Sequence, residues 1–159
     1  MPQAVVTALK APVDRAFALL ASFIETCPDE IWAATSGGWP VWQQIYHALV
    51  AADFFIAQPG QTLPPPLAEA EISELKKAAA TAVPRAAVGE ACAAAKARVD
   101  QFLGRLTDAD LPQRNEPLFA RAKFEMTLAG TVSMLAAHTL YHLGAGDAAL
   151  RDRGLPGVF

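Results

Sequence analysis

Apolar side chains recur at every third or fourth position in four long stretches of the chain, which is the spacing of amphipathic helices. The stretches cover residues 4–25, 39–57, 85–106 and 122 to at least 144. No stretch alternates between apolar and polar residues in the manner of a half-buried strand. The pattern therefore predicts an all-α fold, a single four-helix bundle without a sheet.

Each of the first three helices carries one apolar stripe. Pro12 falls inside the first stripe and predicts a kink or a break near Ala11. Proline also stands at the start of the second helix, at Pro40, where its missing N–H would be unpaired in any case. The stripes comprise Val5, Leu9, Pro12, Ala16, Leu19, Leu20 and Phe23; Trp42, Ile45, Leu49, Ala52 and Phe55; and Val88, Cys92, Ala95, Val99, Phe102 and Leu106.

Turn-forming residues separate the helices. We expect a loop with one turn near residues 30–33, a helix stop or a new cap at residues 107–110, and irregular chain over residues 111–121. The connection between the second and third helices is the longest: it is rich in proline over residues 61–67 and continues as a short helical piece to Ala82. A connection of this length can cross the bundle and let these two helices run parallel. The chain has no internal repeat, and we expect one domain over residues 1–159.

Composition agrees with a small helical protein. Alanine, the best helix former, supplies 34 of 159 residues. The net charge of −3, with no long basic run, argues against nucleic-acid binding. Two cysteines, Cys27 and Cys92, are too few for a disulfide framework, and the N-terminus does not resemble a signal peptide. We therefore expect a cytoplasmic protein with free thiols.

One segment raises the question of a membrane span. Residues 126–146 carry no fixed charge, and a segment of that length can cross a bilayer. However, it contains two histidines, three threonines and a serine, and no polybasic flank marks an orientation. We interpret it as a helix buried among other helices, and we expect no membrane partner.

The candidate chemistry lies in the three histidines of the chain. His138 and His142 are four residues apart, so they share one face of the fourth helix and can bind one metal ion together. His47, in the middle of the second helix, can add a third nitrogen and leave a coordination position open. Alternatively, these histidines are core residues satisfied by hydrogen bonds or by a water network.

The sequence offers no protein base beside these histidines. Thr139 stands where the HExxH metalloprotease motif has glutamate, and Asp147 is spaced to point off the ligand face. Cys92 is expected in the core. Cys27 has acidic neighbours that should raise its thiol pKa, so neither cysteine is a good nucleophile.

Two local patterns resemble the DinB-like superfamily, which comprises four-helix proteins with a three-histidine metal site. In the first, the segment 39–49 begins with Trp39 and reaches His47 eight residues later. The second is the run from His138 to Gly144, followed by Arg151 and Gly154. Ala145 departs from the family pattern, which usually has glutamine there, but that glutamine is not a ligand.

This resemblance implies that His47, His138 and His142 bind a divalent metal ion, such as zinc, nickel or iron, in an up-down-down-up bundle. It also implies a metal-dependent enzyme acting on a small molecule, with thiol-dependent transfer as the candidate reaction and a low-molecular-weight thiol as a second cofactor. The alternative is a non-enzymatic helical binding or stress-response protein with a structural or vestigial metal site. The low charge fraction also favours a homodimer through helix faces.

Overall fold

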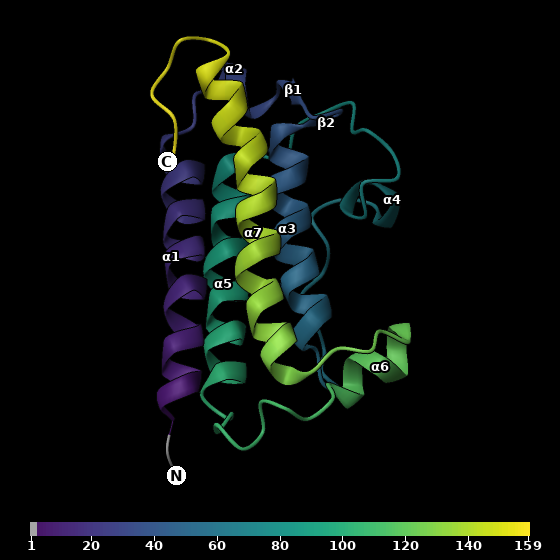
Figure 1. The fold of residues 1–159 in the computed structure, drawn as a ribbon. Helices are drawn as coiled ribbons and strands as arrows, with labels where there is room; N and C mark the ends of the chain where they lie inside the picture. Colours follow the sequence, from purple (N-terminus) through teal and green to yellow (C-terminus); the bar gives the residue numbers. More distant parts are fainter. Residues whose placement is uncertain (1–2) are drawn as a thin grey trace.

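In the computed structural model, which describes residues 3–159, four long helices lie side by side (Figure 1). Helices α1 and α3 each pack against both α5 and α7, and all four contribute to one hydrophobic core. The prediction of an all-α fold is confirmed at this level. The four helices are α1 (Ala4–Thr26), α3 (Val41–Ile56), α5 (Arg85–Leu103) and α7 (Leu128–Arg151).

The core follows the predicted stripes of the second and third helices closely. All the residues predicted for these two stripes are buried, including Leu106 just beyond the end of α5. The first stripe is wrong at its N-terminal end, because Val5 is 51% exposed. The buried residues of α1 are Val6, Val13, Ala16, Phe17, Leu20, Phe23 and Ile24.

Pro12 does not break the first helix, contrary to the sequence-based expectation. Helix α1 runs without interruption from Ala4 to Thr26, and Pro12 lies on its exposed side. Pro12 has no N–H to donate to the carbonyl of Ala8, but Ala8 is also exposed, so water can satisfy that carbonyl. On the opposite side, Val13 and Ala16 are fully buried and hold the helix on the bundle.

A short strand pair precedes α3, where no sheet was expected. Helix α2 (Asp29–Trp32) is the expected turn, and it is followed by the antiparallel strands β1 (Thr35–Ser36) and β2 (Trp39–Pro40). The two residues between the strands, Gly37 and Gly38, have φ of +59° and +90°, as a tight hairpin turn requires. Strands of two residues are too short to show alternation in the sequence.

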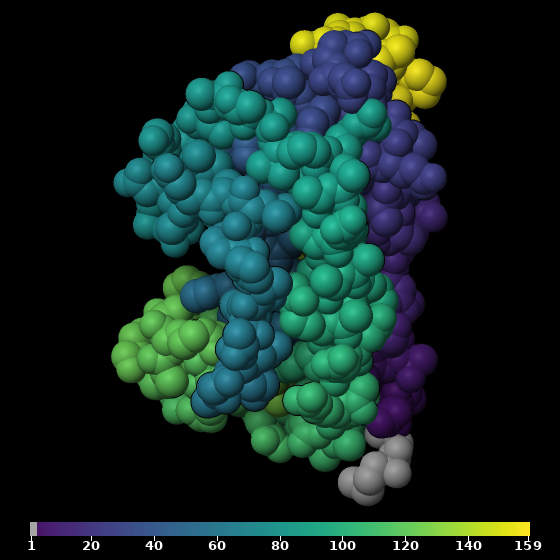
Figure 2. Space-filling view, turned by 180° about the vertical axis from the view of Figure 1, so that it is seen from behind, coloured from purple at the N-terminus to yellow at the C-terminus, as the bar shows by residue number. Residues whose placement is uncertain are grey.

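Two further short helices correct the predicted connections. Helix α4 (Ala70–Ser73) is much shorter than the helical piece expected to extend to Ala82. Helix α6 (Glu116–Ala122) lies where irregular chain was expected, and α7 begins at Leu128 rather than near Ala122. The segments that contain α4 and α6 project from the bundle beside α3 (Figure 1) and form two separate protrusions in Figure 2.

Among residues 3–159, no helix is both long enough and apolar enough to span a membrane.

Candidate metal centre

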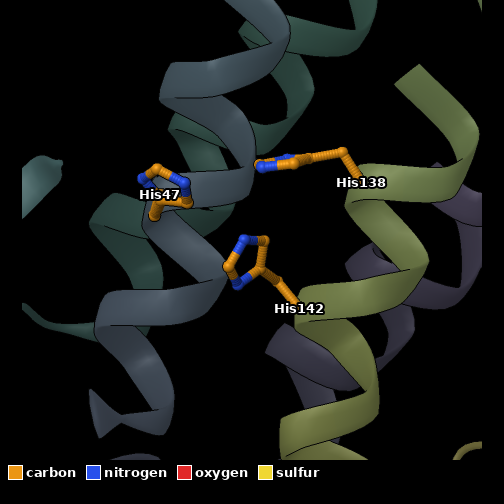
Figure 3. Close-up of side chains that lie close together, drawn as sticks. All are labelled: His47, His138 and His142. Carbon is orange, nitrogen blue, oxygen red and sulfur yellow. The ribbon is translucent and has the colours of Figure 1, made fainter. Parts of the chain in front are cut away.

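Helices α3 and α7 bring together the three histidines that the sequence singled out. His47 comes from α3, whereas His138 and His142 lie one turn apart on α7, which packs directly against α3. One nitrogen from each ring lies within 4.8 Å of the other two. Figure 3 shows a nitrogen of each ring facing the space between the rings.

This spacing is close to what a shared metal ion needs. Metal–nitrogen bonds to imidazole are about 2.0–2.1 Å long, so two nitrogens on one ion lie at most about 4.2 Å apart. The ring centroids are 5.2 Å apart for His47 and His138, 4.7 Å for His47 and His142, and 4.6 Å for the pair on α7. A small inward rotation of the side chains would therefore bring all three nitrogens within reach of one ion.

A backbone carbonyl fixes the orientation and the tautomer of His47. Its Nδ1 atom lies 2.8 Å from the carbonyl oxygen of Ser73, in α4. A carbonyl oxygen only accepts hydrogen bonds, so Nδ1 carries the proton and donates it. In the neutral ring, this tautomer leaves the lone pair of Nε2 free for a ligand.

Burial keeps the two histidines of α7 neutral. Desolvation, reinforced by repulsion from His47, lowers the pKa of His138 to about 4. Desolvation, with repulsion from both neighbouring histidines, lowers the pKa of His142 to about 3. Since a metal ligand has to be unprotonated, both rings are in the state that binds metal at neutral pH.

His142 also has unused hydrogen-bonding capacity. Its side chain is only 4% exposed, and its Nδ1 atom is buried without a hydrogen-bond partner among the described residues. Leaving a buried polar atom unpaired is costly, and native structures usually satisfy such atoms with a ligand, an ion or water. The residues present therefore fit a divalent metal ion bound by three imidazoles.

The ligand group contains no carboxylate. Its members are the three histidines alone. Asp147, further along α7, accepts hydrogen bonds from Arg151 and from the backbone N–H groups of Val158 and Phe159. It holds the C-terminal tail instead of a ligand, so the expectation that it points off the ligand face is confirmed.

Neither cysteine belongs to the site. Cys27 and Cys92 are buried free thiols, and burial raises the pKa of each to about 11. For Cys27, the acidic neighbours Asp29 and Glu30 add to this shift, but desolvation is the main cause. Both thiols stay protonated and unreactive at neutral pH, as the sequence indicated.

Aromatic side chains lie beside the histidines on both sides. The ring of Phe55 is 5.9 Å from that of His138, and the ring of Tyr141 is 5.0 Å from that of His142. Tyr141 is 76% exposed. Phe54 and Phe124, which are both exposed, stack edge to face at 6.3 Å. Phe55 and Tyr141 therefore form an aromatic margin of the site, in which Phe55 is buried and Tyr141 is accessible to solvent.

The sequence could not indicate the contact between His47 and Ser73. The bond uses a backbone carbonyl, to which any residue type could contribute, and it comes from a connection whose path the sequence does not reveal. The aromatic margin is also missed, because Phe55 was interpreted only as part of a core stripe.

A comparison with protein families identifies the family of this chain. Neither a search of curated proteins nor a search of solved structures gave a match. The model of the DinB superfamily matches residues 13–145, which include all three histidines and most of the bundle. The chain thus belongs to the DinB superfamily.

Proposed function

We propose that this protein is a metal-dependent enzyme that acts on a small molecule, with thiol-dependent transfer as the reaction. The observation that carries the proposal is the convergence of three imidazole nitrogens within 4.8 Å, in a superfamily associated with metal binding. Three imidazole ligands suit zinc, nickel, iron or copper. They leave at least one coordination position for a substrate, which is typical of catalytic rather than structural sites.

A bound divalent metal would lower the pKa of a thiol or water molecule held at the open position. The chain's own contribution is to keep His138 and His142 unprotonated by burial, and to orient the ring of His47 through its bond to Ser73. With no carboxylate in the group, the nucleophile has to give up its proton readily. A thiol, with an ordinary pKa near 8.5, does so more easily than water.

The aromatic margin supports a small-molecule substrate with an apolar part. Tyr141 exposes ring surface next to His142, and such a ring contributes binding energy by burying apolar area. No charged side chain belongs to the ligand group, so three neutral imidazoles would leave the charge of a divalent ion uncompensated and favour an anionic group such as a thiolate at the open position.

The first experiment is metal analysis of protein purified without a histidine tag. We expect close to one equivalent of a divalent metal per chain, and its removal by a chelator should lower the melting temperature, because a ligand of the native state stabilises that state. Small thiols added to the metal-bound protein should raise the melting temperature further. Protein that retains no metal and takes up none from solution would refute the proposal.

A second candidate is a non-enzymatic binding or stress-response protein with a structural metal site. The near-complete burial of His142 favours it, since structural sites are closed to solvent. The thiol experiment separates the two candidates. Under the second one, metal removal destabilises the protein, but thiols leave the melting temperature of the metal-bound form unchanged.

We also propose an up-down-down-up order for the four long helices. Gln3, next to the start of α1, donates to the carbonyl of Leu106, just beyond the end of α5, which supports an antiparallel arrangement of these two helices. In Figure 1 the long connection that carries α4 links the lower end of α3 to the upper end of α5.

The proposal extends to association and location. Two copies of the chain would associate through helix faces, and the exposed Val5 and a groove of about 740 Å³ between α1 and α5 are features of one such face. The reduced thiols of Cys27 and Cys92 agree with a cytoplasmic location.

A further inference from the structure

The connection that carries α4 is attached to α3 by a fully buried amide. The side chain of Gln43 has no exposed surface, and its Nε2 atom donates to the carbonyl oxygens of Ile72 at 2.8 Å and Lys77 at 2.7 Å. Its Oε1 atom accepts a hydrogen bond from the backbone N–H of Ala79 at 2.9 Å. Both donor positions and the acceptor of this one side chain are therefore committed to the chain between residues 72 and 79.

The carbonyl that orients His47 immediately follows one of these anchor points. Ile72, held by Gln43, is directly before Ser73, whose carbonyl accepts the bond from Nδ1 of His47. Gln43 and His47 are four residues apart on α3, so they lie on the same face of the helix, one turn from each other. Two successive turns of α3 thus hold two successive carbonyls of α4.

Apart from the bonds of Gln43 and His47, the segment is attached to the bundle by the backbone N–H of Leu67, which donates to the hydroxyl of Tyr46 at 2.8 Å, and by apolar side chains such as Ile72 that pack against the core. Helix α4 has only four residues and no side-chain cap, and the chain turns directly after it through Leu75, which has φ of +56°. Ser73 donates its hydroxyl to carbonyls within the same segment, which shapes the turn but does not fasten it to the bundle. The amide of Gln43 is therefore a principal attachment between α4 and α3.

We propose that Gln43 is a positioning residue of the metal centre: by holding the α4 segment, it places the Ser73 carbonyl that keeps the proton of His47 on Nδ1 and leaves Nε2 free for the metal. Groups that orient a ligating histidine in this way commonly affect metal affinity by about 10- to 100-fold. The side-chain hydrogen bonds of Gln43 all go to backbone groups of residues 72–79, and it acts through that backbone.

The next residue of α3 provides a matched control. Gln44 is also buried, at 5% exposure, but its Nε2 atom donates to the carbonyl of Ser36 at 2.6 Å and thus holds the β1–β2 hairpin instead of α4. The variants Gln43→Met and Gln44→Met remove the same amide from the same helix and keep its length. Their general effect on folding should be similar, whereas only Gln43→Met should affect His47.

The first measurement uses the metal-free protein. Nitrogen-15 NMR of the histidine rings distinguishes the Nδ1-protonated from the Nε2-protonated form, and we expect the parent and Gln44→Met to hold His47 in the Nδ1-protonated form. Gln43→Met should show a mixture of the two forms. An unchanged His47 signal in folded Gln43→Met would overturn the inference. This measurement does not depend on the proposed function, because it needs no metal.

The second measurement is zinc affinity by competition with a chromophoric chelator, and it rests on the proposed function. We expect Gln43→Met to bind zinc at least about 10-fold more weakly than the parent, and Gln44→Met to stay within about threefold. Equal losses in the two variants would overturn the inference. If Gln43→Met does not fold, Gln43→Asn, which keeps the amide but is too short to reach Ile72 and Lys77, takes its place in both measurements. A parent that binds no zinc refutes the proposed function, and the NMR result then decides this inference alone.

Discussion

His142 is the most buried of the three histidines, and its Nδ1 atom has no hydrogen-bond partner among the described residues. Replacing it with alanine removes one proposed ligand while keeping a good helix former in α7. We expect His142→Ala to lose bound metal completely and to keep its helical circular dichroism spectrum. Metal analysis after dialysis against zinc provides the measurement.

Asp147→Ala is the control for that experiment, since Asp147 lies on the same helix but holds the C-terminal tail. It should retain about as much metal as the parent while losing some stability with the tail contacts. Equal metal content in His142→Ala and the parent would remove the case for this site and leave a structural role for the histidines.

The lowered pKa values of His138 and His142 predict that the metal-free protein is sensitive to mild acid. The pKa values in the folded state, about 4 and about 3, lie below the ordinary histidine value of 6.5, so the unfolded chain binds more protons between these limits. The free energy of unfolding should therefore fall as the pH drops from 7 to 5, by about 1–2 kcal/mol for each of the two residues. Urea denaturation at the two pH values measures this difference.

Titration of Asp14 and Asp100 does not contribute to the change in the free energy of unfolding between pH 7 and pH 5. Ion pairs with lysine lower the pKa of Asp14 and Asp100 below the ordinary value of 3.8, so their stabilising effect is complete at pH 5 and is lost only in stronger acid. His142→Ala should reduce the difference between pH 7 and pH 5 by about half, because one of the two buried bases is gone. A variant with the full difference of the parent would contradict this assignment.

The sequence could identify His138 and His142 as a candidate ligand pair, because the spacing of two residues along one helix is a local property of the sequence. Residues four apart on a helix share a face, so the pairing of His138 with His142 follows from their spacing alone. The contribution of His47 needed the resemblance to a family, since nothing in the spacing specifies which faces of two distant helices meet. The hydrogen bond from His47 to Ser73 depends on the path of a connection and could not be predicted.

Among the elements, the contact between α7 and α1 depends on one glycine. A Cβ atom added to Gly146 would lie 2.5 Å from Cζ and 2.9 Å from Cε2 of Phe23, and Phe23 is itself buried. We expect Gly146→Ala to lower the free energy of unfolding by about 1–3 kcal/mol, the cost typical of overpacking. Chemical denaturation measures this loss.

Gly144 provides the matched comparison. It lies about half a turn from Gly146 on the same helix, and a Cβ atom there would meet nothing within 4 Å. Gly144→Ala should stabilise the protein by up to about 1 kcal/mol, as expected for alanine in place of glycine inside a helix. If both variants changed the stability in the same direction, the close approach of α7 to Phe23 would not be the deciding factor.

The sequence predicted long helices well and short ones poorly, for a physical reason. A long helix repeats its apolar spacing several times, as α3 and α5 do, whereas α6 has only seven residues. Its signals were local: Asn115 caps the N-terminus and Pro117 stands in the first turn. Thr127, which caps α7 by accepting from Gly130, likewise marked the true start of that helix. For Pro12 the error was the reverse: the sequence suggested a break that α1 does not have. The effect of a proline depends on which side of the helix faces water.

At the scale of the whole molecule, the proposed homodimer remains to be measured. Low charge and a large apolar fraction leave a small bundle with apolar surface that it cannot bury alone, such as Val5 on α1. We expect light scattering at micromolar concentration to give about twice the mass of the 16.8 kDa chain. A mass equal to that of a single chain across this range would count against association.

The placement of the histidines on α3 and α7 has a consequence for the order of events in synthesis. His47 leaves the ribosome early, whereas His138 and His142 lie near the end of the chain and can pack against α3 only when α7 has emerged. A chain that stops before α7 therefore has one of the three imidazoles, and assembly of the three-histidine site has to follow synthesis of α7 and its packing on α3. Occupancy of the complete site would thus report that α7 has been made and has packed into the bundle.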